Sequence, residues 1–459
     1  MNIVIDLMHL VPGRGGGIVQ LVDGLIQAIA RSGSEHQYFL SCVKGRYTPG
    51  KLPSNFRVWH FELRNYARQL SHALARQSMD VVFRCFPGVE ELSFPLDRQI
   101  VLIVDLQHEA FPEFFDPAEL AQRRETFATV MGGAGAIATI SDFARQTILD
   151  HPATGCRDVF LTCPALRFDH EASSTGDRES FPQGMPEGNF FYFPANPWPH
   201  KNHERLLKAF ARYKELEPSS DVELVLTGSD SGWERWAPLC RGLPVRHMGY
   251  VSAATLRELY RRGMALTFFS LYEGFGMPLL EAFSLDTPVV CSSAGSLPEV
   301  GGDAVLTCDP LDIESMARGM QRIAADAGLR QNLVERGRER LEAYTWEESA
   351  RNFIAACERV TSGSGSSMLS EMIGEALPQE PRDISERMLL RRVQAKLEDL
   401  DRQQRLHVEE YNRAHLFGAL WWAKHLLARV RKKLGLKKPA KVTTDCQNDD
   451  AEATTRKAA

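Results

Sequence analysis

The sequence predicts an α/β protein with two Rossmann-like, doubly wound domains that face each other across a cleft, followed by a long helical extension. Short β-branched runs alternate with amphipathic helical stretches over residues 1–180 and again over 190–360, which is typical of parallel sheets with crossover helices. The chain has 459 residues. Since a single core stops growing at roughly 250 to 300 residues, we expect two globular domains and an additional segment.

The strand signals divide into two sets on either side of a turn-rich stretch. In the first domain we expect strands that include 2–7, 81–84, 100–104 and 136–140, and in the second 190–194, 223–227, 266–269 and 288–291. Residues 171–189 carry turn formers without periodicity, so they predict an interdomain linker.

The composition changes after residue 360. Residues 361–382 include a Ser/Gly run and predict a flexible linker, residues 383–438 predict a long helix, and residues 439–459 predict a disordered tail. Within the helix, apolar residues from Leu390 to Ala414 step by three and four, but the middle of this seam is polar. A short coiled coil and an amphipathic helix packed on the body both remain open.

The end of that helix combines aromatic and basic residues. Trp421 and Trp422 precede a run from Lys424 to Lys441 in which every charged residue is basic. This pattern predicts an interfacial helix that contacts the inner face of a membrane, or a partner protein, through residues 384–438. The alternative is a surface helix docked on its own domain with a solvated basic tail.

The charge and cysteine content exclude several classes of protein. Lys and Arg total 54 against 59 Asp and Glu, and the nine cysteines include no C-x-x-C pair. The global charge therefore gives no reason to expect a nucleic-acid partner, and neither a disulfide framework nor a structural zinc site is expected. With no secretory signal and no stretch of roughly 18 apolar residues, we expect a cytoplasmic protein that associates peripherally with the membrane.

A glycine-rich turn follows the first expected strand. Gly15, Gly16 and Gly17 precede a helix that is expected from Ile18 to about Arg31. Such a turn brings backbone N–H groups at a helix N-terminus close to an anion. However, Ile18 stands where the dinucleotide fingerprint requires its third glycine, so a strand–helix turn without any ligand is the alternative.

The second domain carries a more informative loop with two glutamates. Glu273 directly precedes Gly274–Gly276, and Glu281 follows inside the helix that Pro278 is expected to start. The loop amides and the helix dipole converge on one anion-sized place. Each glutamate alone is an ordinary surface residue, and the combination with the glycines favours a binding site.

A lysine follows the first strand of the second domain. Lys201 stands at the start of a helix, at the C-terminal edge of a parallel sheet, where phosphates bind in such folds. By itself it could equally be a solvated charge.

These motifs, in this order, resemble glycosyltransferase family 4, the retaining nucleotide-sugar glycosyltransferases of the GT-B fold. The second-domain match consists of the E-x7-E pattern from Glu273 to Glu281, Lys201-Asn202, Gly249-Tyr250-Val251 and Leu297-Pro298-Glu299-Val300. The first-domain match consists of Gly15 to Gly17, Asp105-Leu106-Gln107-His108 and Ser141-Asp142-Phe143. The resemblance covers residues 1 to about 360, and its second-domain motifs are the more specific. It implies an acceptor-binding domain over residues 1–180 and a nucleotide-sugar-binding domain over residues 190–360.

The resemblance implies a role for each matching residue in the second domain. Lys201 would neutralise the departing nucleotide diphosphate, and the amides of Gly274, Phe275 and Gly276 would receive the same charge. Glu281 would bond the ribose hydroxyls. Glu273 would contact the donor sugar and stabilise positive charge near the anomeric carbon.

In the first domain, the resemblance implies that Gly15, Gly16 and Gly17 close on the diphosphate and that His108 faces the donor sugar. Glu273, His108 and Lys201 are the expected catalytic residues. The chain departs from the family where an arginine often precedes the lysine by five residues, because Asn196 stands there. Diphosphate stabilisation is then expected to rest on Lys201, with a possible share for His200.

A second departure concerns the histidine itself. Many members have His-Asp where this chain has Val104-Asp105, so a packing role for His108 remains an alternative.

No metal and no cofactor are expected. The nucleotide sugar is a substrate, and the literal D-x-D motif, Asp399-Leu400-Asp401, is interpreted as solvated charge in the C-terminal helix.

The sequence therefore predicts a retaining, metal-independent hexosyltransferase. Its resemblance to polysaccharide-assembly mannosyltransferases implies transfer of mannose from GDP-mannose to a lipid-linked or polysaccharide acceptor in bacterial surface glycan synthesis of the O-antigen or capsule type. A UDP-sugar donor is an alternative, because the loop residues do not distinguish the bases. A non-catalytic GT-B scaffold, or an epimerase or phosphorylase on the same fold, are the rivals from other classes.

Overall fold

The computed structural model describes residues 1–10, 16–88, 92, 94–156, 158–166 and 185–363. All of them belong to one compact unit, Met1–Glu371. The expected helical extension (383–438) and tail (439–459) lie outside the described residues, as do most of the two expected linkers (171–189 and 361–382). Within the described ranges, no helix combines the length and the apolar character needed to cross a membrane.

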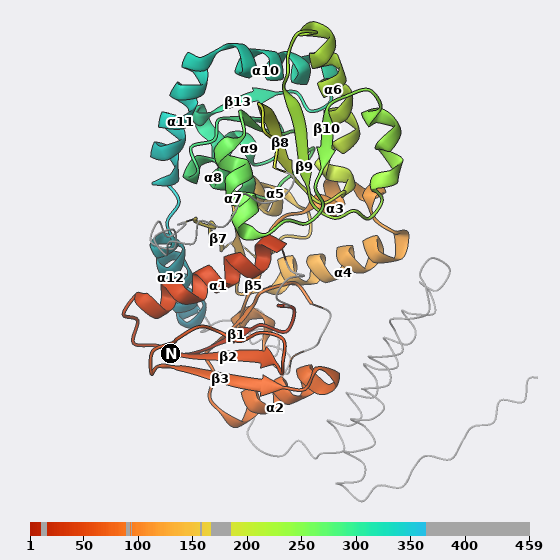
Figure 1. The fold of residues 1–459 in the computed structure, drawn as a ribbon. Coiled ribbons are helices and arrows are strands. Elements are labelled where there is room, and N and C mark those ends of the chain that lie inside the picture. The colour runs from red at the N-terminus through yellow and green to blue at the C-terminus, as the bar shows by residue number, and fades with distance from the viewer. Residues whose placement is uncertain (11–15, 89–91, 93, 157, 167–184, 364–459) are drawn as a thin grey trace, which may run out of the picture. The chain divides into compact units, whose positions relative to one another are not determined.

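The first sheet is parallel and has seven strands in the order β3-β2-β1-β4-β5-β6-β7 (Figure 1). Its strands are β1 (Asn2–Asp6), β2 (Gln37–Val43), β3 (Phe56–Phe61), β4 (Val81–Arg84), β5 (Gln99–Leu102), β6 (Ala136–Thr139) and β7 (Val159–Leu161). The connecting helices are α1 (Gly16–Arg31), α2 (Tyr66–Arg76), α3 (Gln107–Ala110), α4 (Pro117–Gly133) and α5 (Asp142–Asp150). This arrangement confirms the first doubly wound sheet.

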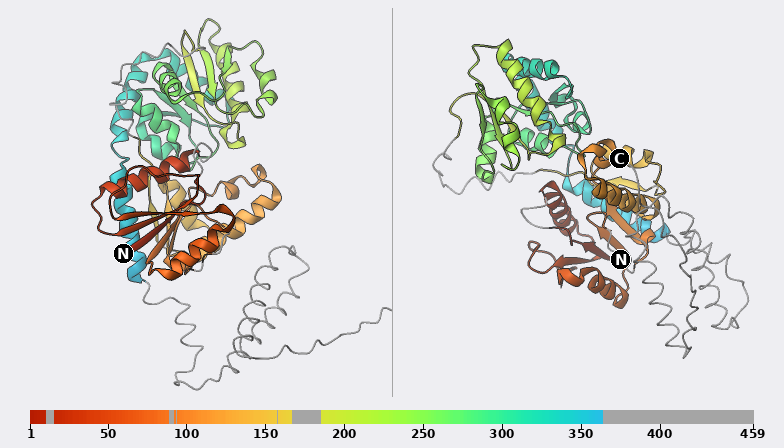
Figure 2. Two further views of the ribbon diagram at one scale, coloured as in Figure 1. Left: turned by 60° about the horizontal axis from the view of Figure 1, so that its bottom comes forward. Right: turned by 90° about the vertical axis from the view of Figure 1, so that its right-hand side faces the viewer.

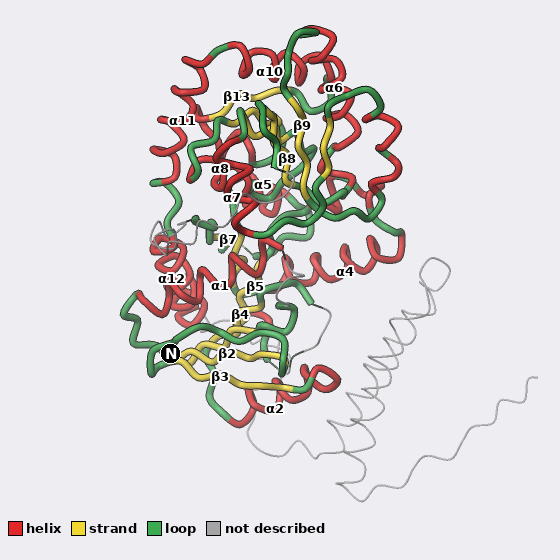
Figure 3. Tube along the Cα trace, in the orientation of Figure 1, coloured by secondary structure: helices red, strands yellow, loops and turns green. Residues whose placement is uncertain are grey.

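The second sheet is also parallel, with six strands in the order β10-β9-β8-β11-β12-β13 (Figure 3). Its strands are β8 (Phe190–Pro194), β9 (Glu223–Thr227), β10 (Val245–His247), β11 (Ala265–Phe268), β12 (Val289–Ser292) and β13 (Val305–Cys308). Its helices are α6 (His203–Leu216), α7 (Ala253–Arg262), α8 (Met277–Ser284), α9 (Leu297–Gly301), α10 (Ile313–Ala325) and α11 (Ala327–Leu341). Short 3-10 turns complete the connections: Leu63–Asn65, Leu96–Arg98, Pro112–Phe114, Pro199–Lys201, Trp233–Arg235, Ala237–Cys240 and Gly302–Ala304.

Alternation along the strands builds the core of the first sheet on both of its faces. Val4, Val82 and Val101 pack on the side of α2, α4 and α5, whereas their neighbours Ile3 and Ile5 pack on the side of α1. All of these side chains are buried. Because both faces of a parallel sheet are covered by helices, its strands are apolar throughout, and this explains why the strand signals are clear in the sequence.

The last described helix, α12 (Trp346–Gly363), corrects two expectations about the domain boundaries. The sequence assigns residues up to 360 to the second domain, yet α12 packs on α1 and on the first sheet (Figure 2). Phe353 meets Phe83 of β4 with ring centroids 5.0 Å apart, and Asn352 donates to the Leu161 carbonyl. The apolar stripe of α12 covers a sheet face that α1 leaves open, and the helix continues three residues into the expected linker.

Each sheet has a point where the strand order reverses. In the first sheet it lies between β1 and β4, and in the second between β8 and β11. Loops leave the carboxyl ends of such neighbouring strands in opposite directions and open a crevice, where ligands bind in open α/β folds. The search for a site therefore begins at the ends of these four strands.

Candidate functional site

The reversal point of the second sheet brings together the two charged residues that the sequence singled out. Lys201 follows β8 in a 3-10 turn (Pro199–Lys201), and Glu273 follows β11 at the start of the loop to α8. Lys201 Nζ lies 2.6 Å from Glu273 Oε1, and each side chain is 12% exposed. The structure thus joins two predicted catalytic residues in one short, mostly buried ion pair at the mouth of the expected crevice.

Asn202 holds Lys201 in this position. Its backbone is left-handed, with φ of 62°, a conformation that asparagine tolerates better than most residues. Its side-chain amide donates to the carbonyls of Phe269 (3.0 Å) and Pro310 (2.8 Å). Because Phe269 follows β11 directly, these bonds tie the turn that carries Lys201 to the strand that leads to Glu273.

The loop Gly274–Gly276 presents backbone donors beside this pair. All three residues are buried, and within the described part of the chain nothing accepts a hydrogen bond from their N–H groups. Gly276 adopts φ of 102° and precedes the first turn of α8, so the loop lies at the positive end of that helix dipole. Buried residues whose N–H groups lack a partner are rare, and such donors are available to an anion.

Glu281 lies inside α8 and is held by a tyrosine that sequence reasoning did not identify. The hydroxyl of Tyr260 in α7 donates to Glu281 Oε2 at 2.5 Å. Burial raises the pKa of Glu281, and the Tyr260 hydrogen bond opposes that rise. Only an ordinary helical position marks Tyr260 in the sequence, so no local signal could have connected it to Glu281.

Of the three glycines in the first-domain turn, Gly17 is the one whose surroundings are described. Gly16 begins α1, and Gly15 lies outside the described residues. A Cβ atom on Gly17 would lie 3.9 Å from Cγ of Met277, the first residue of α8. The first turn of α1 therefore lies close to the side chain of the residue that begins α8.

Asp105, part of a matched motif but without a predicted role, also belongs to this site. A Cβ atom on Gly274 would lie 2.5 Å from the Val104 carbonyl oxygen and 3.0 Å from Asp105 Oδ2, so only glycine fits there. Burial raises the pKa of Asp105, a bond from the Gln107 amide opposes the rise, and the charge of Glu273 adds to it. An acid directly after an expected strand was the signal that could have found it.

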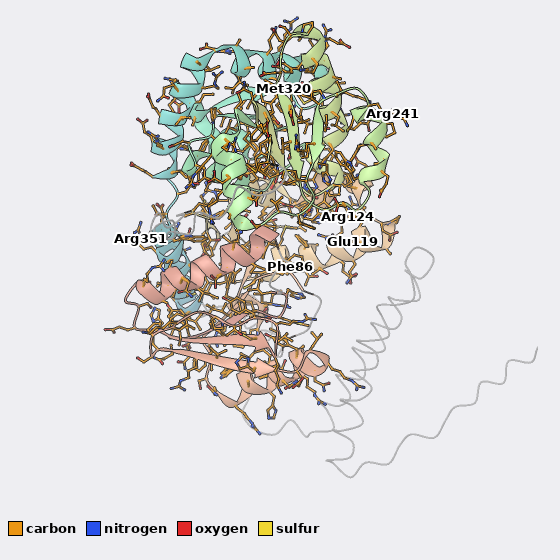
Figure 4. The ribbon with its side chains drawn as sticks, in the orientation of Figure 1. Phe86, Glu119, Arg124, Arg241, Met320 and Arg351 are labelled. Atoms are coloured by element: carbon orange, nitrogen blue, oxygen red, sulfur yellow. The ribbon has the colours of Figure 1, made fainter. Side chains whose placement is uncertain are left out.

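The structure favours the packing alternative for His108. Its ring is buried between Phe127, with centroids 4.5 Å apart, and Phe115, and its nearest carboxylate is that of Glu109. Arg124 of α4, labelled in Figure 4, binds Glu109 at 2.9 Å. Burial lowers the pKa of His108 to about 4, so the ring is neutral at neutral pH. These contacts all come from the first domain, and none of them joins His108 to the Lys201–Glu273 pair.

Two residues near Lys201 require a different interpretation from the one the sequence suggested. Burial lowers the pKa of His200 to about 4, so a neutral His200 adds no positive charge to that of Lys201 at neutral pH. Asn196, which replaces the arginine common in the resembling family, accepts a hydrogen bond from the Ser229 N–H at 2.9 Å. Asn196 therefore shapes the loop after β9 and leaves Lys201 as the cation at this place.

A pocket of about 200 Å³ opens next to Asn196, at the carboxyl ends of β8 and β9. Thr227, Gly228 and Val251 line it, and Tyr250, which is 75% exposed, stands at its rim. A larger groove of about 740 Å³ lies between β3 and α2, but its lining contains none of the site residues. We give more weight to the smaller pocket because it adjoins the reversal point where the charged residues meet.

The reversal point of the first sheet holds a second buried polar cluster, which the sequence did not indicate. Asp6 ends β1 and accepts from the Tyr66 hydroxyl at 2.7 Å and from the Met8 N–H at 3.1 Å. Arg84 ends β4 and places Nε 3.7 Å from Asp6 Oδ2.

Among the residues that the structure describes, no three His, Cys, Asp or Glu side chains gather closely enough to hold a metal ion.

Two doubly wound parallel sheets, with the Lys201–Glu273 pair at the reversal point of the second, define a GT-B protein. The sucrose-phosphate synthase of Thermosynechococcus elongatus shares this fold, with a TM-score of 0.61 at 17% identity over 79% of this chain and 100% of that chain. Residues 177–340 match the family model described as glycosyl transferases group 1. This match lies in the second domain and agrees there with the resemblance to a glycosyltransferase family.

Two curated relatives are similar to this chain over stretches of different length. The O-antigen chain mannosyltransferase B of Escherichia coli is 29% identical over 270 residues, which are 57% of this chain and 70% of that protein. The MMP alpha-(1->4)-mannosyltransferase of Mycolicibacterium hassiacum is 34% identical over 169 residues, which are 35% of this chain and 40% of that protein. Both names describe mannosyl transfer.

Proposed function

We propose that this protein is a retaining, metal-independent mannosyltransferase that transfers mannose from GDP-mannose to a lipid-linked or polysaccharide acceptor in the assembly of a bacterial surface glycan. The names of the two relatives support mannose as the sugar, and that of the Escherichia coli protein supports an O-antigen type of product. Retention of the anomeric configuration follows from the resemblance to glycosyltransferase family 4.

One observation carries the proposal: Lys201 pairs with Glu273, and Glu273 directly precedes three loop amides that have no partner among the described residues, at the N-terminus of α8. Cleavage of a nucleotide sugar leaves a diphosphate whose negative charge grows in the transition state. Donors that are already oriented toward that charge stabilise it without reorganisation, and each such donor is typically worth about 100- to 1,000-fold in rate. A metal is not required where a cation, amides and a helix N-terminus supply this stabilisation.

The remaining site residues receive roles from where they lie. Glu273 is paired with Lys201, and a bound diphosphate would compete for Lys201 and release the Glu273 carboxylate to face positive charge at the anomeric carbon. Glu281, oriented by Tyr260, is placed one helical turn further in, where it would accept from ribose hydroxyls. The pocket beside Tyr250 would hold the base of the nucleotide. Because Gly17 has no side chain, it would allow the first domain to lie close to the phosphates.

A scaffold without activity is the rival that the geometry disfavours. A mostly buried ion pair and a row of buried N–H groups without partners both reduce stability unless they serve a ligand. A protein that only recruits other enzymes through residues 384–438 has no physical need for either. An epimerase or phosphorylase would use the same donor site, and a product without a new glycosidic bond would identify it.

The test is a thermal-shift series of the full chain with GDP, UDP, ADP and dTDP. A nucleotide at 100 times its dissociation constant stabilises the native state by about 2.7 kcal/mol. We expect a selective shift with GDP, followed by mannosyl transfer from GDP-mannose to a lipid-linked glycan. A selective UDP shift would replace the donor and keep the mechanism, whereas no shift with any nucleotide would overturn the proposal.

We also propose, from the sequence alone, that residues 384–438 bring the enzyme to the cytoplasmic face of the membrane. Their aromatic and basic residues fit an anionic headgroup region. The test compares the full chain with a variant that ends at Gly363, using vesicles that contain anionic lipids. Loss of vesicle binding with retained transfer to a water-soluble acceptor supports an anchor, and unchanged vesicle binding would exclude it.

A further inference from the structure

Two serines and a glutamate, to which no role has been given above, bind the Gly274–Gly276 loop and its surroundings from two sides. Ser296 Oγ donates to the carbonyl of Glu273 at 2.9 Å and to that of Phe275 at 2.8 Å. Ser141 Oγ donates to the carbonyl of Gly274 at 2.6 Å. Three successive carbonyl groups of the anion loop are therefore engaged by serine hydroxyls.

These bonds determine where the loop amides point. In a trans peptide the C=O and the N–H of the next residue lie in one plane and point in opposite directions. Ser296, by holding the carbonyls of Glu273 and Phe275, orients the N–H groups of Gly274 and Gly276. Ser141, by holding the carbonyl of Gly274, orients the N–H of Phe275. Each of the three amides thus points away from the serine that holds the carbonyl before it.

The two serines come from different domains. Ser296 precedes α9 in the second domain, whereas Ser141 precedes α5 in the first domain and is fully buried. The Ser141 hydroxyl also accepts from the Ala144 N–H at 3.0 Å, so it caps α5 while it donates to Gly274. One of the three loop amides is therefore oriented by a residue of the other domain.

Glu299 of α9 fixes the segment that carries Ser141. Its two carboxylate oxygens accept from the N–H groups of Asp142 (2.8 Å) and Phe143 (2.7 Å), the first residues of α5. Arg340 in turn donates to the backbone carbonyls of Glu299 (2.6 Å) and Val300 (3.0 Å). A carboxylate at a helix N-terminus is favoured by the helix dipole, so this contact holds α5 against α9.

We propose that Ser141 and Glu299 are positioning residues that orient the Phe275 amide toward the nucleotide diphosphate, so that the first domain completes the anion site of the second. This inference rests on the proposed function, because it assigns residues to the same diphosphate site. It makes diphosphate affinity depend on the contact between α5 and the loop, even though neither Ser141 nor Glu299 touches the ligand.

The test measures the dissociation constants of GDP and of guanosine by calorimetry for the full chain and its variants. Ser141→Ala should weaken GDP binding about tenfold, which is the effect of one misdirected hydrogen bond to a charged group, and leave guanosine binding within twofold. A merely structural defect would weaken both ligands, since guanosine lacks only the phosphates. Ser141→Thr keeps a hydroxyl and should restore GDP affinity to within threefold of the wild type.

Two further variants complete the design. Asp326→Ala also removes a helix N-cap, the bond from the Leu329 N–H, but lies on the exposed start of α11, so GDP affinity should stay within twofold. Glu299→Gln retains one acceptor oxygen and should weaken GDP binding about threefold to fivefold, again without an effect on guanosine. GDP binding by Ser141→Ala equal to that of the wild type would overturn the inference, and so would equal losses for GDP and guanosine.

The result separates this inference from the proposed function. A wild-type protein that binds neither GDP nor UDP contradicts both. A wild-type protein that binds UDP instead is tested with UDP and uridine in the same way. If the wild type binds a nucleoside diphosphate and Ser141→Ala binds it equally well, only the positioning role fails.

Discussion

The two sheets have the same doubly wound topology, but their reversal points are built for opposite purposes. In the first sheet, Asp6 and Arg84 are 5% and 6% exposed, and Tyr66 and a backbone amide complete the bonding of the carboxylate. In the second sheet, Lys201 and Glu273 form a mostly buried pair beside loop amides that have no partner among the described residues. Only the second ion pair therefore has unbonded backbone donors described beside it.

The difference shows that the same fold can hold a structural ion pair or a candidate binding site, depending on its side chains. A buried ion pair with additional hydrogen bonds is a structural element whose removal affects folding. A pair beside unbonded amides is prepared for a charge that arrives with a ligand. Substitutions at the two points should therefore separate stability from binding, and four predictions test this separation, beginning with the largest effect.

The largest effect is expected at Glu273. Glu273→Gln keeps the shape of the side chain but removes the charge that would stabilise the anomeric carbon, so kcat should fall by about 100- to 1,000-fold. The thermal stability should change little, because the amide can still accept from Lys201. The control is Glu258→Gln on the exposed face of α7, which should leave kcat within twofold. Full activity of Glu273→Gln would remove its catalytic assignment.

The next effect concerns stability at the first reversal point. Arg84→Met leaves the buried Asp6 carboxylate without its cation and should lower the free energy of unfolding by about 3 kcal/mol. The affinity for GDP should stay within twofold. Arg31→Met, at an exposed position at the end of α1, should change stability by less than about 0.5 kcal/mol. Denaturant titration measures both, and a large loss of GDP affinity in Arg84→Met would contradict the comparison.

Lys201→Met should show the reverse behaviour. Loss of the cation beside the diphosphate should weaken GDP binding about 30-fold, which corresponds to about 2 kcal/mol, with a smaller loss of stability than Arg84→Met. Lys208→Met, on the exposed face of α6, removes a lysine that pairs with Glu204 at the surface and should leave GDP binding unchanged. If Lys201→Met bound GDP normally but unfolded easily, the second reversal point would be structural as well.

The smallest effect depends on pH. Tyr260→Phe removes the hydroxyl that bonds the charged Glu281 carboxylate and should cost about 1.5 kcal/mol of stability at neutral pH. The Tyr260 bond opposes the rise of the Glu281 pKa that burial causes, so the cost should be largest where Glu281 is ionised. It should shrink as the pH falls through the raised pKa of Glu281 toward the ordinary value of 4.5.

The matched control for the pH series is Tyr213→Phe. Its hydroxyl bonds that of Ser220, a neutral partner, so the stability cost should be of similar size but should not decrease between neutral pH and pH 5. Denaturant titrations at several pH values measure both variants. A cost of Tyr260→Phe that stays constant over this range would show that Glu281 does not change its protonation state between neutral pH and pH 5.

Much of the site was predictable because its residues lie within short motifs. Glu273, Glu281 and the intervening glycines occupy one loop and one helix, and the expected strands 190–194 and 223–227 agree with β8 and β9. Local patterns of this kind depend on backbone conformation and on burial within a few residues. Tyr260 and Ser296 were not identified, because a tyrosine or serine in an ordinary helix or turn has no local signal for a distant partner.

His108 and α12 show the limits of prediction from local pattern. The sequence could place His108 near a motif but could not tell that Phe115 and Phe127 enclose its ring. It could identify the apolar stripe of α12 but not the sheet face that the stripe covers. Both outcomes depend on which segments meet, and a residue's own neighbours in the chain carry no information about that.

The sequence by itself determined the two doubly wound domains and the chemical character of the site, because strand alternation, glycines and charged residues at loop starts are local properties. Only the tertiary structure decided that Lys201 meets Glu273 across 72 residues and that Ser141 meets Gly274 across 133. The physical reason is that strand order, which arises from the packing of whole βαβ units, brings distant carboxyl ends to one edge. The sequence determines which side chains are present, and the strand order determines which of them meet.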